Sequence, residues 1–272
     1  MPLNALSRRV LLPATVLTAG LLVATVATAE MRPIQIQNAR VVQPGQMELF
    51  GNLAYELSRE PAGADYDNLR VGPLGMRFGL ENAVEVGGHL TFNSNSGDSS
   101  GDPDESGLEA LTGFAKVAIF PGISAEGGIR VAGSDDVGPY PMDGIDFYVN
   151  LAAEQEVGAQ GKVYGEIGLT IQDNDGFGGT YENWGLGYAH RINPRLSLNA
   201  ELVGDAAPGV GFIGVSEIDG DEVRIGGGNH MDLVLGANYN VQQAMLLRPY
   251  VSVGVYDASP DVAVGIGVDF PL

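Results

Sequence analysis

Cysteine is absent from the 272-residue chain, so disulfide bonds and thiolate metal sites are excluded. Basic residues are also scarce: 14 lysines and arginines stand against 34 aspartates and glutamates, and such an acidic chain is not expected to bind nucleic acid. After residue 29, no stretch has the run of about twenty apolar residues that a membrane-spanning helix requires. Stability must therefore come from backbone pairing and side-chain burial.

Residues 1–29 have the three parts of a secretory signal peptide. Arg8 and Arg9 precede an apolar run over residues 10–26, and Ala27-Thr28-Ala29 follows it as a small-residue cleavage site. Cleavage before Glu30 removes two basic and no acidic residues, which leaves 12 basic against 34 acidic residues and a formal charge of −22. We expect an exported protein.

Residues 30–45 show no sustained hydrophobic period and contain Pro33 and Pro44. We therefore predict a periplasmic N-terminal tail over these residues, followed by a barrel over residues 46–272. The sequence leaves open whether this tail enters the barrel.

In the last stretch, DVAVGIGVDFPL over residues 261–272, apolar residues alternate with small or acidic ones, and no polar residue interrupts the apolar face. Val262, Val264, Ile266, Val268 and Phe270 take every second position, with small or acidic residues between them. Nine or ten residues is about the length that a tilted strand needs to cross a bilayer. This pattern predicts the closing strand of a transmembrane β-barrel.

The same alternation recurs from residue 46 onward and predicts an all-β, antiparallel, up-and-down barrel of about twelve strands. Bacterial outer-membrane barrels have an even number of strands. The eleven strands before the closing one are expected near residues 47–57, 69–80, 83–92, 111–120, 123–133, 145–154, 162–171, 181–192, 195–204, 231–239 and 247–256.

The connections separate a membrane barrel from a soluble β-sandwich, whose strands would also alternate. Short links, such as Pro121-Gly122 and Asn193-Pro194, alternate along the chain with long polar links, of which residues 206–229 form the longest. The one exception is the last connection, residues 257–261, which is short where the alternation predicts a long link. Outer-membrane barrels have short periplasmic turns and longer extracellular loops. We expect the outer membrane of a Gram-negative bacterium, periplasmic termini, and contacts with lipid and, during biogenesis, with the barrel-assembly machinery.

The inward phase of the strands carries charges of both signs together with tyrosines. Two interpretations stay open: the charges pair and fill the lumen, or they line a narrow passage whose acidic excess favours cations. The candidate lumen-lining residues are Arg77, Glu85, Lys116, Glu126, Arg130, Asp146, Tyr148, Lys162, Tyr164, Glu166, Arg191, Glu201, Asp232, Arg248 and Tyr250.

Motifs for catalysis, cofactors or metals are weak in this sequence. The acidic stretches at residues 173–176 and 219–222 lack the full ligand spacing of a calcium loop, so solvated loop tips are expected there. The three histidines are scattered over three strands, and no motif supplies a Ser-His pair. We predict no catalytic residues, no cofactor and no metal site.

The whole mature chain resembles the outer-membrane barrels known as transporter-like or phenol-degradation MetA-type proteins. The resemblance rests on FGLENAVEV at residues 78–86, YAHRINPRLSLNAEL at residues 188–202, and the final hairpin from RPYVSVGVY to VGIGVDF. The chain departs from the common barrel ending because it finishes Phe270-Pro271-Leu272 rather than on an aromatic residue.

From the pattern and the resemblance together, we expect a channel or uptake protein for passive diffusion of small solutes, hydrophobic or aromatic ones included. The alternative is a non-transporting structural or surface-interaction barrel that uses its acidic extracellular loops, above all residues 206–229. A continuous water path would favour the channel, and a blocked lumen with ordered loops would favour the alternative.

Overall fold

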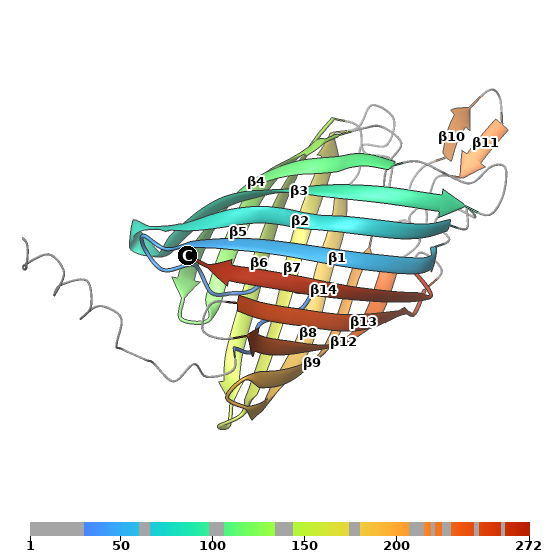
Figure 1. The fold of residues 1–272 in the computed structure, drawn as a ribbon. Coiled ribbons are helices and arrows are strands. Elements are labelled where there is room, and N and C mark those ends of the chain that lie inside the picture. The colour runs from blue at the N-terminus through green and yellow to red at the C-terminus, as the bar shows by residue number, and fades with distance from the viewer. Residues whose placement is uncertain are drawn as a thin grey trace, which may run out of the picture.

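A computed structural model describes residues 30–59, 66–97, 106–133, 144–173, 180–206, 215–218, 221–224, 230–241, 245–256 and 259–272. Twelve strands close into one antiparallel barrel (Figure 1), which confirms the predicted fold class. They are β1 Met47–Arg59, β2 Tyr66–Leu80, β3 Val84–Gly97, β4 Ser106–Phe120, β5 Ile123–Ala132, β6 Ile145–Val157, β7 Gly161–Asp173, β8 Thr180–Asn193, β9 Leu196–Ala206, β12 His230–Val241, β13 Met245–Gly254 and β14 Val262–Pro271.

Neighbouring strands are consecutive along the barrel, and pairing of β1 with β14 closes it from Glu48↔Pro271 to Leu57↔Val262. Between β9 and β12 the chain forms two further short strands, β10 Val215–Ile218 and β11 Asp221–Arg224, which pair in a separate sheet. The sequence did not predict this hairpin, because its four-residue strands are too short to show a period.

The predicted signal peptide lies outside the described residues, as do most of the long connections, including the greater part of 206–229. Among the described residues, no helix is both long and apolar enough to cross a bilayer.

Several strands extend beyond the predicted ranges at the end of the barrel where the long connections lie, called here the long-loop end. Thus β3 continues to Gly97 and β4 begins at Ser106, and Ser94 pairs with Ser106 beyond the apolar stretch. Backbone pairing needs no apolar side chain, so the ladder continues where hydrophobic alternation has stopped. The opposite end, with the tight connections, is called the short-turn end.

Large apolar side chains cover the outside of the barrel. They occupy every second position on each strand and are exposed in the isolated chain, as a lipid-facing belt requires. Examples are Leu53, Leu69, Met76, Val86, Leu111, Val117, Ile129, Phe147, Leu151, Ile167, Leu169, Leu186, Leu198, Leu235, Val253, Val264 and Ile266.

Ile167, at the middle of β7 and 60% exposed, tests this belt. We expect Ile167→Arg to reduce the free energy of unfolding in lipid vesicles by about 2–4 kcal/mol, because a charged side chain at the bilayer midplane is poorly solvated. The measurement is urea unfolding followed by tryptophan fluorescence. Val157→Arg at the end of β6 is the matched control, with about 0–1 kcal/mol expected near the interface. Equal effects at both depths would contradict the placement of the belt.

Residues 30–46, called the N-terminal segment, enter the barrel lumen with their first part and leave it before β1 begins. The Glu30 carbonyl accepts a hydrogen bond from Ser197 Oγ (3.1 Å), and the Gly45 amide donates to the Gly79 carbonyl (2.8 Å), so both ends lie at the short-turn end. Met31, Ile34 and Ile36 are buried in a cluster with barrel residues. The segment thus forms a loop that enters the lumen and returns to start β1, which answers the question that the sequence left open.

Inward tyrosines lie over glycines of neighbouring strands. A Cβ atom added at Gly187 would lie 2.2 Å from the Tyr164 ring, and one at Gly265 would lie 2.3 Å from the Tyr250 ring. These glycines leave room for the rings, which accounts for part of the high glycine content of the chain.

Candidate functional site

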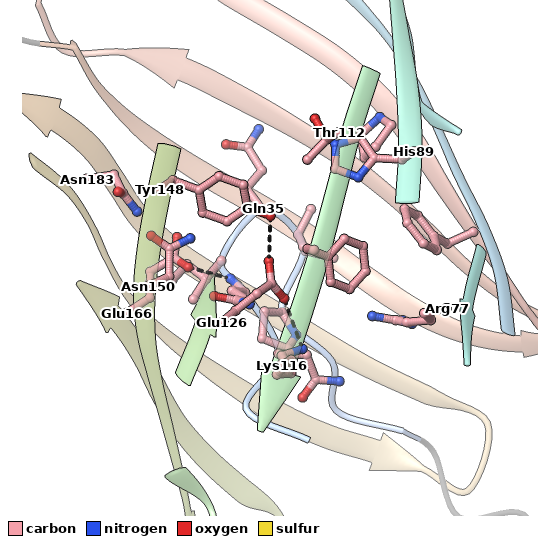
Figure 2. Close-up of a pocket in the computed structure, with 18 of the residues that line it drawn as sticks. Gln35, Arg77, His89, Thr112, Lys116, Glu126, Tyr148, Asn150, Glu166 and Asn183 are labelled. Atoms are coloured by element: carbon pink, nitrogen blue, oxygen red, sulfur yellow. Dashed lines mark hydrogen bonds and ion pairs between the residues drawn. The ribbon is translucent and has the colours of Figure 1, made fainter. Parts of the chain in front are cut away.

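A cavity of about 520 Å³ lies between the N-terminal segment and the barrel wall. Residues 32–38 form one side of it. The barrel strands supply the rest, with charged, amide, hydroxyl and aromatic side chains that include Phe50, Arg77, His89, Thr112, Phe114, Lys116, Glu126, Arg130, Tyr148, Asn150, Glu166, Thr170, Asn183, Asp205, Arg248 and Asp269. Figure 2 shows a close-up of this cavity and of the side chains that line it.

The tip of the N-terminal segment is held by Glu201, which is 1% exposed. Its carboxylate accepts hydrogen bonds from the backbone amides of Ile34 (2.5 Å), Gln35 (2.9 Å) and Ile36 (3.4 Å) and from Tyr164 Oη (2.7 Å). A carboxylate is well suited to this task because it offers several acceptor sites and no donor. The chain bends at residues 34–36, outside the barrel sheet, and these consecutive amides obtain their hydrogen bonds in this way.

Two further wall carboxylates bind amides of the segment. Glu166 accepts from the Gln37 amide at 2.9 Å, and Glu85 accepts from the Val42 amide at 2.7 Å. The inward acidic residues therefore accept hydrogen bonds from backbone amides of the N-terminal segment, in addition to forming ion pairs with basic residues.

Arg32 is the main charged anchor of the segment. Its guanidinium binds Glu48 in a bidentate fashion, with Nη1–Oε1 at 2.6 Å and Nη2–Oε2 at 2.8 Å, and it also contacts Glu30 and Asp269. Burial alone would lower the pKa of Arg32, but the hydrogen bond to Glu48 and the three carboxylate charges raise it above its ordinary value. Arg32 therefore stays charged and docked.

The basic side chains of the cavity wall all have acidic partners. Arg77 binds Glu48, Arg130 Nε lies 2.9 Å from Asp146 Oδ2, and Arg248 Nε lies 3.0 Å from Asp269 Oδ2. Lys116, whose side chain is 1% exposed, lies between Glu85 (3.8 Å) and Glu126 (3.7 Å). This pairing offsets the desolvation of charges in the closed interior.

An arc of aromatic rings forms part of the wall on β1, β3, β4 and β6. The His89 ring lies 6.0 Å from that of Phe50 and 6.2 Å from that of Phe114, and Arg77 lies over Phe50 at 5.2 Å. Tyr148 continues the arc and donates a hydrogen bond to Glu126 Oε1 (3.0 Å). The cavity can therefore accommodate an apolar or aromatic group beside charged ones.

The structure gathers seven of the fifteen predicted lumen residues around the cavity: Arg77, Lys116, Glu126, Arg130, Tyr148, Glu166 and Arg248. Glu85 and Asp146 lie behind them as partners of Lys116 and Arg130, and Tyr164 and Glu201 lie against the segment tip.

The remaining four predicted residues lie away from the cavity. Lys162 pairs with Glu154 (3.3 Å), Asp232 contacts His230 (3.1 Å), and Tyr250 accepts a hydrogen bond from Asn52 (3.1 Å). Arg191 lies near the short-turn end, where its Nη1 is 3.5 Å from the Ala159 carbonyl oxygen. Arg191 is therefore not among the cavity-lining residues, because β8 approaches its turn there.

Sequence reasoning missed several cavity residues. The inward-facing positions of the strands also include Asn150, Thr170 and His89, which were not among the candidates. Extending the same every-second-residue pattern along β1 and β4 would have identified Phe50 and Phe114 as well. The contribution of residues 32–38 had no signal in the sequence, since that stretch has no period.

Comparisons with known proteins agree with this architecture. No family model matches the chain, and no curated protein matches it. A solved outer membrane channel from Pseudomonas putida F1 is similar to it with a TM-score of 0.62 and 15% identity, over 88% of this chain and 100% of that one. The β domain of the Bordetella autotransporter BrkA is similar with a TM-score of 0.55 and 12% identity, over 82% of this chain and 98% of that one.

These identities are low, so the likeness concerns the fold. The resemblance to MetA-type proteins remains a prediction. The closed sheet, its exposed apolar belt and these neighbours together show that the chain has the fold of an outer-membrane β-barrel, with twelve strands and an N-terminal segment inside the lumen.

Proposed function

We propose that this barrel is a passive channel for small solutes across the bacterial outer membrane. The observation that carries the proposal is the internal cavity of about 520 Å³, which is lined by paired charges and an aromatic arc and bounded by the N-terminal segment. The similar fold from Pseudomonas putida F1, itself an outer membrane channel, supports the same function.

In this proposal the long-loop end faces the outside of the cell and the short-turn end faces the periplasm, as in other outer-membrane barrels. Solutes diffuse down their gradient into the cavity and pass the N-terminal segment, which narrows the short-turn half of the lumen. The arc of Phe50, His89, Phe114 and Tyr148 favours solutes with a hydrophobic or aromatic part. The acidic side chains Glu126 and Glu166 favour cations over anions.

Single-channel recording in planar bilayers tests this function. We expect the refolded mature chain to conduct in monovalent salt with a cation preference, read from the reversal potential. Replacing both Glu126 and Glu166 by glutamine should move the reversal potential toward zero, because two negative charges leave the cavity wall.

Glu81→Gln is the matched control, since it removes a negative charge at the exposed short turn between β2 and β3. It should leave the reversal potential close to that of the parent. A barrel that is folded by its heat-modifiable gel mobility, yet silent in salt and impermeable to small aromatic solutes in loaded vesicles, would contradict the channel.

A further inference from the structure

A row of polar side chains crosses the cavity wall on β3, β4 and β5. His89 lies opposite Thr112 in the strand register, and Thr112 lies opposite Arg130, so the three are at the same height in the barrel. All three line the cavity. Figure 2 shows His89 and Thr112 next to each other, away from Lys116 and Glu166. We call these three residues the donor row, because each has an N–H or O–H group in its side chain.

Arg130 is the charged member of the donor row. Its Nε and Nη2 both donate to the same oxygen, Asp146 Oδ2, at 2.9 and 2.5 Å. In the described part of the chain, Arg130 Nη1 has no hydrogen-bond partner. The Arg130 side chain is 29% exposed, whereas that of Asp146 is 5% exposed. The guanidinium therefore faces the cavity, and its carboxylate partner lies behind it in the wall.

A second ion pair on this side of the cavity has the same orientation. The Arg70 side chain is 34% exposed and that of its partner Glu109 is 6% exposed. Arg70 and Arg130 are both close enough to His89 to interact with it electrostatically. Glu126, which favours cations, lies closer than Arg130 to the start of β5 at the short-turn end. The charge that a solute meets at the donor row is therefore positive, although each ion pair is neutral as a whole.

Two rings of the aromatic arc form the next row toward the short-turn end. Phe114 and Tyr148 both lie opposite Gly128 in the register, one on each side of it. A Cβ atom added at Gly128 would lie 2.4 Å from the Tyr148 ring, and one added at Gly87 would lie 2.4 Å from the Phe114 ring. Each ring thus lies against the backbone of a glycine. The side of the ring that is turned away from the wall faces the cavity.

The donor row and the two rings lie two residues apart along their strands, which is about 7 Å. A molecule of the size of benzoate spans this separation when its carboxylate binds Arg130 and its ring lies against Phe114 or Tyr148. The cavity volume of about 520 Å³ is also within the range of small-molecule sites, about 300–1,000 Å³. Charge and shape together therefore select a ligand with an anionic end and an aromatic end.

We propose that this side of the cavity binds aryl carboxylates. The carboxylate accepts hydrogen bonds from Arg130 Nη1 and from the Thr112 hydroxyl group or the His89 ring, and the aryl group lies against Phe114 and Tyr148. A hydrogen bond between a guanidinium and a carboxylate is about twice as strong as one between neutral groups. The inference goes beyond the proposed channel function, because it concerns a ligand that is held at equilibrium and not the solutes that pass.

Isothermal titration calorimetry on the folded barrel in a nonionic detergent, with empty micelles subtracted, tests the site. The probe is benzoate, and the comparison ligands are benzyl alcohol and cyclohexanecarboxylate. We expect saturable binding of benzoate and at least about tenfold weaker binding of the neutral alcohol, which lacks the charge. Cyclohexanecarboxylate keeps the charge but not the aromatic ring, so we expect about threefold weaker binding.

Two variants localise the binding. Arg130→Gln combined with Asp146→Asn replaces the ion pair by two amides and leaves no buried charge without a partner, and it should bind benzoate at least about tenfold more weakly. Phe114→Leu removes one ring and should weaken benzoate binding about threefold, with little effect on cyclohexanecarboxylate.

Arg40→Gln is the matched control. Arg40 is also a partly exposed arginine with a glutamate partner, but it pairs with Glu154 and Glu156 and lies outside the benzoate site. Glu154 keeps a basic partner in this variant, since Lys162 lies 3.3 Å from it. The control should bind benzoate like the parent, and heat-modifiable gel mobility confirms the folding of every variant.

The site would be overturned if benzoate shows no saturable binding, if benzyl alcohol binds equally well, or if the folded double variant binds like the parent. If the double variant does not fold, the comparison ligands and Phe114→Leu decide. Equal binding of benzoate and cyclohexanecarboxylate would overturn the role of the rings. A silent barrel that binds benzoate would refute the channel and keep the site, and a conducting barrel without binding would refute the site alone.

Discussion

Deletion of residues 30–45 from the mature chain is expected to raise the single-channel conductance several-fold. The deleted residues include Met31, Ile34 and Ile36, which are packed inside the lumen. Twelve strands lie between the eight of a filled barrel and the sixteen of an open porin, so removing an internal segment should open a wider aqueous path. Planar-bilayer recording of the deletion variant beside the parent measures the effect.

The same deletion should strengthen the cation preference. It removes Arg32 and Arg40 and only one carboxylate, that of Glu30, while Glu48, which binds Arg32 in the parent, stays in the wall. Gel mobility before and after heating is the control for folding, since β1 and β14 still close the barrel without the segment. Unchanged conductance in a folded deletion variant would show that the N-terminal segment does not limit the passage.

Replacing Glu201 by leucine is expected to release the segment tip without removing the segment. The change leaves the amides of Ile34 and Gln35 and the hydroxyl of Tyr164 without their acceptor. Each unsatisfied buried donor costs about 1–3 kcal/mol, so docking of the tip should weaken by several kilocalories per mole. Hydrogen exchange of the peptide that contains residues 32–38, followed by mass spectrometry, should accelerate strongly.

Glu201→Gln is the matched control for this prediction, because its amide oxygen still accepts hydrogen bonds while the charge is lost. It should show a smaller acceleration than the leucine variant. Amides in the centre of β6 report on the barrel itself and should exchange as slowly as in the parent. If residues 32–38 remain protected in Glu201→Leu, the tip is held by its apolar contacts and by Arg248, which donates to the Pro33 and Ile34 carbonyls.

The inward positions of the cavity could be assigned from the sequence, but their partners could not. Strand alternation placed Lys116, Glu126, Tyr148 and Glu166 on one face because the side-chain period of a strand is two. Alternation does not state which residue lies across the lumen. Glu201 and the Ile34 amide, for example, are 167 positions apart.

The sequence by itself determined the fold class, the number of barrel strands and the face on which each candidate lies. These properties follow from local chemistry. A strand with one face toward lipid must alternate apolar side chains with inward-facing ones, and a meander with an even number of strands must close into a barrel so that no strand edge is left unpaired in the membrane. Only the tertiary structure decided the path of residues 30–46, the partners of the inward carboxylates and the glycines over which the inward tyrosines lie. These features depend on the strand register and on contacts between distant segments, which leave no periodic trace in the chain.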